Sequence, residues 1–121
     1  MKNFTDTQFP RGAVFYIDLG RADGTSKQAG LRPCILISSD INNRYSPNVN
    51  IVCLTDARHT KNPLPVHLYI SSKESGLEKD SICLCEQTFT VSKSELLNYV
   101  TTLSPQIMQR VSECLKIQFS L

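Results

Sequence analysis

The chain has 121 residues, of which 40% are hydrophobic and 20% are charged, and its formal net charge is +2. This balance predicts one folded domain over residues 1–121 and excludes global disorder, while no apolar run approaches the ~18 residues of a membrane span. A net charge this small does not by itself indicate a nucleic-acid partner.

Short apolar segments separated by turn-rich connections predict β-strands along the first half of the chain. The polar N-terminus MKNFTDTQFPRG lacks the apolar segment of a signal peptide, so we expect a cytoplasmic protein. The first strand is expected over Ala13–Leu19 and the second over Cys34–Ser38. Between them, residues 20–33 contain three glycines and predict a long loop, which in a compact domain is often functional. Residues 40–48 are predicted to form a second polar loop.

Three further strands are expected in the second half of the chain. The third covers Val49–Thr55 and is followed by a basic loop over residues 58–63. The fourth covers Val66–Ile70 and the fifth Ser81–Gln87, with room for a short sixth strand near Phe89–Val91.

Two helices are expected to close the chain. The first is short and covers Lys93–Asn98. The second is better specified, because Ser104 can cap its N-terminus and Pro105 suits the first helical position. Its apolar residues recur at helical spacing and predict a face packed on the core: Ile107, Met108, Val111, Cys114 and Leu115. These elements predict a mainly β fold, a small bent antiparallel sheet or barrel with C-terminal helices.

The five cysteines have no C-x-x-C spacing, so we expect buried free thiols in a reducing compartment. There is also no G-x-S-x-G, no Gly-rich phosphate loop, no H-E-x-x-H and no Cys/His cluster, so we expect neither a cofactor nor a metal. His67, within a strand, is expected to be structural. His59, in the basic loop, is a surface residue or a nucleic-acid contact.

Arg32 and Thr55 are the residues that could carry chemistry. Arg32 stands at the mouth of the second strand, and its planar fork of donors matches a phosphate group. Thr55 ends the third strand, and its hydroxyl can donate to a phosphate oxygen. Fixed donors of this kind stabilise the negative charge that gathers in phosphodiester transesterification. From the residues alone, Arg32 could equally be a structural cation and Thr55 a plain strand-end threonine.

A series of short motifs runs in order along residues 10–121. They are Arg11-Gly12, Val14-Phe15-Tyr16, Asp18-Leu19, Ser26, Gln28, Gly30, Arg32-Pro33, Asp40-Ile41, Asn43-Arg44-Tyr45-Ser46-Pro47, Thr55, Leu64-Pro65, His67, Lys79-Asp80-Ser81, Glu86-Gln87 and Val111–Leu115. In this order and spacing, the motifs resemble the MazF/PemK family of toxin endoribonucleases.

The resemblance implies a small SH3-like β-barrel with C-terminal helices, related in fold to the gyrase poison CcdB. It implies a homodimer that cuts single-stranded mRNA at short sequence motifs without a metal. The 2′-hydroxyl would attack the adjacent phosphate and leave 2′,3′-cyclic phosphate and 5′-hydroxyl ends. A MazE-like antitoxin would cover the RNA groove. The alternatives are a CcdB-like gyrase poison without enzymatic activity, a catalytically weak relative that only binds RNA or antitoxin, and an SH3-like interaction module.

The family's catalytic arginine matches Arg32, and its catalytic threonine matches Thr55. The RNA-binding residues that the resemblance implies are Lys27, Gln28, Asn43, Arg58 and Gln87. Two departures bear on the site. Lys27 stands where the family commonly has an acidic residue, which inverts a charge beside the expected site. Phe89 stands where an arginine is common, and it is either a core residue or a stacking surface for a base.

Overall fold

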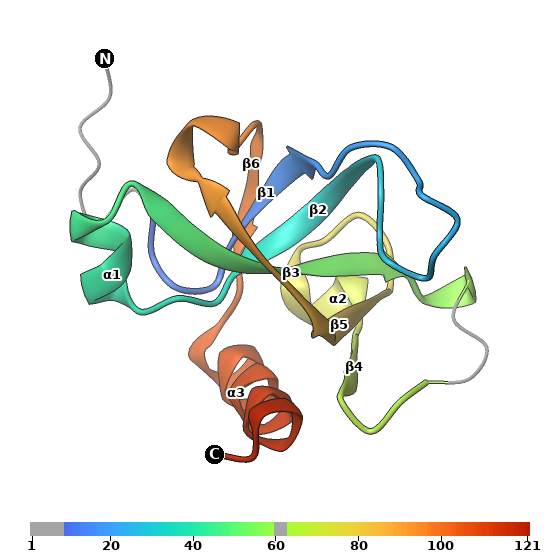
Figure 1. The fold of residues 1–121 in the computed structure, drawn as a ribbon. Coiled ribbons are helices and arrows are strands. Elements are labelled where there is room, and N and C mark those ends of the chain that lie inside the picture. Colours follow the sequence, from blue (N-terminus) through green and yellow to red (C-terminus); the bar gives the residue numbers. More distant parts are fainter. Residues whose placement is uncertain (1–8, 60–62) are drawn as a thin grey trace.

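The computed structural model describes residues 9–59 and 63–121. Six strands form one curled antiparallel sheet, a half-barrel in the order β4-β5-β3-β2-β1-β6, and a helix closes the chain (Figure 1). The strands are β1 (Ala13–Asp18), β2 (Leu31–Leu36), β3 (Asn48–Asp56), β4 (His67–Ile70), β5 (Ser81–Ser92) and β6 (Tyr99–Thr102). The α-helices are α1 (Asp40–Tyr45), α2 (Ser72–Ser75) and α3 (Pro105–Phe119), and short 3₁₀ turns cover Ala57–His59 and Lys93–Glu95. The predicted mainly β fold is confirmed.

Both faces of the sheet hold buried side chains, and alternate residues of each strand contribute to opposite faces. Val14, Ile35, Val52, Leu54, Cys83 and Cys85 join the buried side chains of α3 in one cluster. Their strand neighbours Ala13, Phe15, Ile17, Cys34, Leu36, Ile51, Cys53, Ile82 and Leu84 form a second cluster on the other face. This arrangement explains why the strands read as nearly continuous apolar runs rather than as alternating ones.

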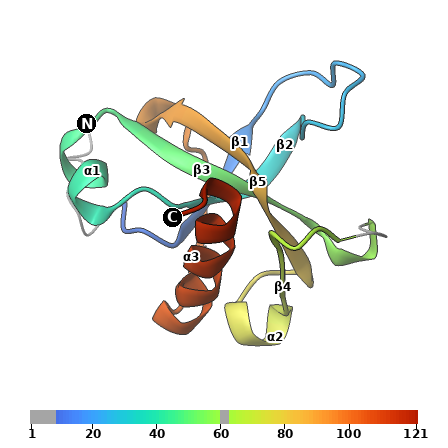
Figure 2. The ribbon, with the colours of Figure 1, turned by 60° about the horizontal axis from the view of Figure 1, so that its bottom comes forward.

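The C-terminal helix forms as its sequence predicts. The Ser104 hydroxyl accepts a hydrogen bond from the backbone N–H of Ile107, and Pro105 lies in the first turn. Four of the five apolar residues of the predicted face are buried and Leu115 packs beside them, so the face serves the core. Figure 2 shows α3 crossing under the sheet, where it packs against β4 and β5.

Two predictions about the connections are wrong. Residues 40–48 were expected to form a loop, but they form α1 and the start of β3. The Ser39 side chain caps α1 by accepting from the N–H of Asn42. The expected helix over Lys93–Asn98 is only a single 3₁₀ turn, because the chain then enters β6 and pairs with β1. One α-helix, rather than two, therefore follows the sheet.

Two strand boundaries also differ from expectation. β2 begins at Leu31, because Leu31 and Arg32 pair with Asp18 and Ile17 of β1. The predicted fifth and short sixth strands are one strand, β5. Its partner β3 steps from Val52 to Cys53 while β5 steps from Thr88 to Leu84, so residues 85–87 bulge out of the β3–β5 ladder.

All five cysteines are buried and free, as predicted. Within residues 9–59 and 63–121, no group of three or more His, Cys, Asp or Glu side chains is arranged to hold a metal ion. None of the helices in this part of the chain has the length and apolar character needed to cross a membrane.

Candidate active site

Arg32 and Thr55 both stand at the point where β2 and β3 separate. The β2–β3 ladder ends at the pair Cys34 and Cys53, and two residues further along each strand stand Arg32 and Thr55. Because side chains alternate with period 2, both lie on the face of the sheet that holds the two cysteines. Pro33 has no N–H with which to extend the ladder, so the strands part at this point.

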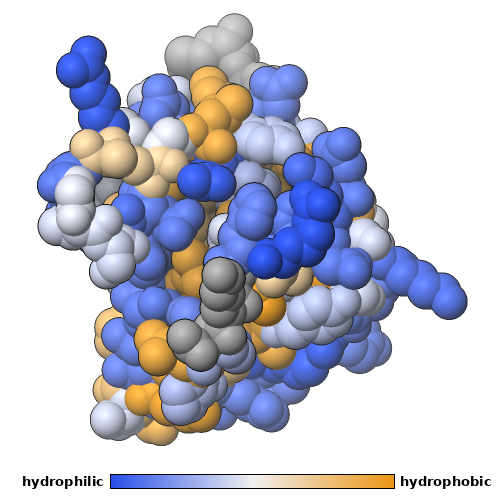
Figure 3. All heavy atoms as spheres, turned by 90° about the vertical axis from the view of Figure 1, so that its right-hand side faces the viewer, coloured by the Kyte–Doolittle hydropathy of each residue, from blue (hydrophilic) through white to orange (hydrophobic). Residues whose placement is uncertain are grey.

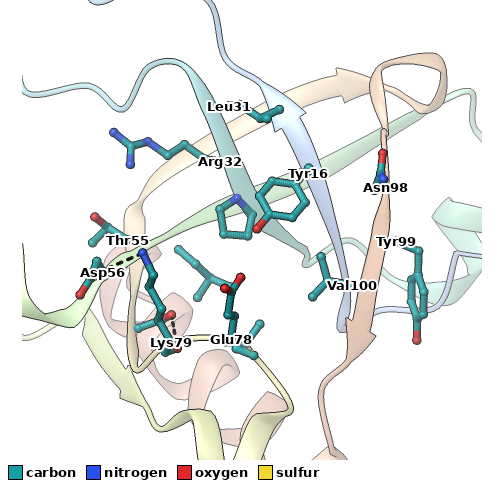
Figure 4. Close-up of a pocket in the computed structure, with 14 residues that line it drawn as sticks. Tyr16, Leu31, Arg32, Thr55, Asp56, Glu78, Lys79, Asn98, Tyr99 and Val100 are labelled. Atoms are coloured by element: carbon teal, nitrogen blue, oxygen red, sulfur yellow. Dashed lines mark hydrogen bonds and ion pairs between the residues drawn. The ribbon is translucent and has the colours of Figure 1, made fainter.

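A hollow of about 500 Å³ opens at this end of the sheet (Figure 4). Arg32 and Thr55 line it, together with Tyr16 and Leu31 from the β1–β2 side and Lys79 from the connection after α2. The side chain of Arg32 is half-buried, and its Nε donates to the backbone oxygen of Ala29 at 3.0 Å. That bond fixes the stem of the side chain and leaves the terminal nitrogens to face a ligand.

Thr55 is followed directly by a charged cluster. Two nitrogens of the Arg58 guanidinium donate to the Asp56 carboxylate, and the closest contact is 2.8 Å between Nη2 and Oδ2. The backbone N–H of Arg58 donates to the same carboxylate at 2.9 Å. These bonds hold the pKa of Asp56 well below its usual range. Lys79 Nζ lies 3.8 Å from Asp56 Oδ2, so this carboxylate draws a second cation toward Thr55.

A second hollow of about 450 Å³ lies along the β1–β2 loop, and Arg32 lines this one as well. Arg21, Lys27 and Gln28 complete its polar lining. Lys27 Nζ is 3.2 Å from Asp23 Oδ2, and both side chains are largely exposed. The hydroxyl and N–H of Thr25 donate to Asp23, which lowers the pKa of that carboxyl to about 2. Figure 3 shows that the side of the molecule carrying this loop is mainly hydrophilic, with a few hydrophobic residues exposed among the polar ones.

Gln87 fastens the β1–β2 loop to the sheet. It lies in the bulged segment of β5, whose residues are not paired with β3. Its Oε1 accepts from the N–H of Gln28 at 2.7 Å, and its Nε2 donates to the backbone oxygen of Ser26 at 3.1 Å. Two of the predicted RNA-binding residues, Gln28 and Gln87, are thereby brought together close to Arg32.

Asn43 is not part of this region. It lies in α1, on the side of the molecule opposite the β1–β2 loop (Figure 1), and its side chain is fully buried. Its Nδ2 donates to the backbone oxygen of Ser38 at 3.0 Å, and its Oδ1 accepts from the Ser38 hydroxyl. This burial leaves Asn43 no surface with which to contact RNA, and its hydrogen bonds give it a structural role.

Three other expectations are answered by the packing. His67 is structural as predicted, because its Nδ1 accepts from the N–H of Leu64 and its Nε2 lies 2.9 Å from Glu86 Oε1. Phe89 is partly buried against the core, which favours the core interpretation over a stacking surface. His59 is an exposed residue of the 3₁₀ turn.

The sequence did not point to Tyr16 or Lys79 as members of the site. Both residues belong to motifs of the family resemblance, Val14-Phe15-Tyr16 and Lys79-Asp80-Ser81, but sequence reasoning assigned neither of them a role in the site. Only the Asp56–Lys79 contact, which joins residues far apart in the sequence, brings Lys79 to Thr55 (Figure 4).

The sequence and the fold were compared with those of known proteins. Residues 10–119 match a family model described as a PemK-like, MazF-like toxin of type II toxin–antitoxin systems. Endoribonuclease EndoA of Bacillus subtilis is 40% identical over 111 residues, which are 92% of this chain and 94% of that protein. A mycobacterial endoribonuclease solved with its cognate antitoxin has a TM-score of 0.76 at 24% identity, covering 93% of this chain and 95% of that one. MazF of Deinococcus radiodurans has a TM-score of 0.74 at 13% identity, covering 93% and 96%.

Proposed function

The chain belongs to the PemK-like, MazF-like toxins of type II toxin–antitoxin systems, and we propose that it acts as a single-domain endoribonuclease on single-stranded mRNA. The observation that carries the proposal is that Arg32 and Thr55 line one hollow at the open end of β2 and β3. Cleavage would occur at short sequence motifs, since a groove lined by loops can read unpaired bases.

The reaction we propose is transesterification within the RNA. The guanidinium of Arg32 holds the scissile phosphate and stabilises the charge that develops on its oxygens, and Thr55 donates a further hydrogen bond. The 2′-hydroxyl attacks the adjacent phosphorus, and the products are a 2′,3′-cyclic phosphate and a 5′-hydroxyl. None of these roles requires a metal ion, so we expect cleavage to continue in the presence of EDTA.

Four residues around the hollows are proposed to bind RNA on either side of the cleaved bond. Lys27 and Arg58 carry exposed positive charge that can face phosphates. Gln28 lines the second hollow beside Arg32, and its backbone N–H is held by Gln87, so the hollow offers this residue to a bound nucleotide. Gln87 holds the loop in place and can contact a base beside it.

We also propose a homodimer that is inhibited by a MazE-like antitoxin and acts in the cytoplasm. Large apolar side chains are exposed beside the hollow, where Leu31 is 59% and Tyr99 57% accessible. Exposed apolar surface around a polar site suits a protein partner. The mycobacterial relative solved with its cognate antitoxin supports an antitoxin for this chain as well.

The family match and the 40% identity to an endoribonuclease favour this function over a CcdB-like gyrase poison and over an SH3-like interaction module. A relative that binds RNA or antitoxin but cuts poorly is the alternative that the test below must separate. The feature that favours this alternative is Lys27, a positive charge beside Arg32 at a position where the family commonly has an acidic residue.

The test compares cleavage of a long single-stranded RNA by the unmodified protein, Arg32→Ala and Thr55→Val. We expect discrete cuts that Arg32→Ala reduces by about 10²–10³-fold, the usual cost of removing one fixed donor from a developing anion. Arg44→Ala is the matched control, because it removes an exposed arginine from α1, far from the hollow. Absence of cuts by the folded, unmodified protein would refute the nuclease and favour a binding protein.

A further inference from the structure

Cys34 and Cys53 form the last pair of the β2–β3 ladder, directly beside the candidate active site. They are Cα partners on adjacent antiparallel strands, and the ladder continues inward from this pair. Beyond the pair, β2 and β3 diverge toward Arg32 and Thr55 (Figure 1). Both thiols are free and fully buried, and the proposed cleavage reaction uses neither of them.

This pair of cysteines has the geometry that a disulfide requires. Directly opposite residues of an antiparallel ladder have Cα atoms about 4.5–5.5 Å apart, within the range of about 4.4–6.8 Å that disulfides span. Both side chains point to the same face of the sheet, where they belong to one buried cluster. The two thiols already interact, because a hydrogen bond with Cys53, together with burial, raises the pKa of Cys34. Joining the two sulfurs therefore needs little movement of either strand.

The Cys34 thiol also contacts the candidate catalytic arginine. It donates to the backbone oxygen of Arg32, with 3.5 Å between Sγ and O. A disulfide places the two sulfurs about 2.0 Å apart, so oxidation turns Cys34 Sγ toward Cys53 and ends its contact with Arg32. The same bond draws β2 toward β3 two residues from Arg32 and Thr55. Oxidation of this pair is therefore expected to displace the groups that face the phosphate.

We propose that Cys34 and Cys53 form a reversible redox switch, in which hydrogen peroxide converts the two thiols into a disulfide that slows RNA cleavage; its effect on cleavage rests on the proposed endoribonuclease function. One thiol sulfur attacks an oxygen of the peroxide, the O–O bond breaks, and a sulfenic acid and one water form. The second sulfur then attacks the sulfenic sulfur, the S–O bond breaks, and the S–S bond and a second water form. The two thiols lose two electrons and two protons, and the peroxide gains them.

Burial determines when the switch responds. The thiolate is the form that attacks an oxidant, and the raised pKa of Cys34 keeps its thiol protonated while the ladder is closed. The pair lies at the end of the ladder, and Pro33 has no N–H with which to extend it, so this end opens more readily than the pairs further inside. Pro33 and Leu54, the residues next to the two cysteines, line the hollow through which peroxide can enter. The switch is therefore expected to respond to sustained rather than brief exposure to peroxide.

A second close pair of thiols, Cys83 and Cys85, provides a comparison. Their sulfurs lie 3.6 Å apart, but both residues belong to β5. Residues two apart on a strand have Cα atoms about 6.4–6.8 Å apart, at the upper limit for a disulfide. Both side chains lie in the cluster that includes α3, on the opposite face of the sheet from Cys34 and Cys53. Oxidation of Cys83 and Cys85 is therefore not expected to displace the groups that face the phosphate.

The experiment treats the reduced, full chain with hydrogen peroxide and maps its disulfides by mass spectrometry of peptides. We expect a bond between Cys34 and Cys53 and a Tm higher by about 10 °C, the rise that follows from closing a loop of about 20 residues. Cleavage of single-stranded RNA should fall at least about 10-fold, because a displacement of about 1 Å can cost about 10²-fold, and dithiothreitol should restore it. Cys53→Ala should keep its cleavage rate after peroxide treatment, whereas the matched control Cys83→Ala should stay sensitive to peroxide.

Absence of the bond between Cys34 and Cys53 in the treated, unmodified protein would overturn the proposal, and so would a bond that leaves cleavage unchanged. Equal sensitivity of Cys53→Ala and the unmodified protein to peroxide would overturn it as well and would attribute the effect to another thiol. If the reduced, unmodified protein does not cut RNA, the proposed function fails and the control of cleavage fails with it. The peptide map and the Tm still show in that case whether the disulfide forms.

Discussion

Gln87 is predicted to control the order of the β1–β2 loop, which the Gln87→Ala substitution tests. The substitution removes the bonds to the N–H of Gln28 and the backbone oxygen of Ser26, at 2.7 and 3.1 Å. A net hydrogen bond contributes about 0.5–1.5 kcal/mol, and the second of these bonds is exposed to solvent. We therefore expect the closed loop to lose about 1–2 kcal/mol, or roughly 5- to 30-fold in its opening equilibrium.

Hydrogen exchange measures this change directly. The N–H of Gly30 donates to the Gly20 oxygen at 2.7 Å and reports on the closed loop. Its exchange should quicken by roughly the same 5- to 30-fold in Gln87→Ala, with RNA affinity falling in parallel. Gln87→Glu keeps the acceptor for Gln28 and loses the donor to Ser26, so its effect should be the smaller part.

Gln106→Ala, which removes an exposed glutamine from α3, is the control and should leave the exchange of Gly30 unchanged. If Gln87→Ala also leaves the exchange of Gly30 unchanged, the two bonds do not hold the loop, and the assignment of Gln87 is incorrect.

The remaining predictions concern Asn43, Lys27 and Asp23. Asn43→Ala should lower the free energy of unfolding by about 2–3 kcal/mol in urea titrations, because it leaves buried polar groups of Ser38 without a hydrogen-bond partner. The RNA affinity of the folded protein should stay within about twofold. A large loss of affinity without a loss of stability would instead place Asn43 in the RNA site. Lys27→Glu should weaken RNA binding and reduce the slope of log affinity against log salt by roughly 0.7 for each RNA phosphate that the protein no longer neutralises; an unchanged slope would exclude Lys27 from phosphate binding. The Asp23 carboxyl should titrate by NMR with a pKa of about 2, below its ordinary value of 3.8. Its hydrogen bonds with Thr25 and its ion pair with Lys27 therefore stabilise the loop above pH 3.8, and this stabilisation is lost as the pH falls through about 2. A pKa near 4 would contradict these contacts.

The sequence predicts the framework of this molecule well where one local signal dominates. Ser104, Pro105 and the helical recurrence of apolar residues are sufficient for α3. Runs of buried residues mark the strands, and they are continuous because the curled sheet is covered on both faces. The resemblance to the family pointed to Arg32 and Thr55, and the β2–β3 register explains why both stand at the same end of adjacent strands.

The failures share a physical cause, which is dependence on tertiary contacts. The segment of α1 carries no apolar stripe, and it is helical because Ser39 caps it and the side chain of Asn43 is buried and hydrogen-bonded to Ser38. β6 is too short to give a recognisable sequence pattern, and its pairing with β1 defines it. Lys79 joins the site only through an ion pair to Asp56. No local pattern encodes contacts of this kind.

In the proposed mechanism, Arg32 and Thr55 act on one phosphate and drive transesterification without a metal. The most direct measurement is mass spectrometry of the ends produced from a single-stranded RNA in the presence of EDTA. We predict a 2′,3′-cyclic phosphate on one side of each cut and a 5′-hydroxyl on the other, with both products reduced by about 10²–10³-fold for Arg32→Ala. Ends carrying a 5′-phosphate, formed only when Mg²⁺ is added, would contradict this mechanism.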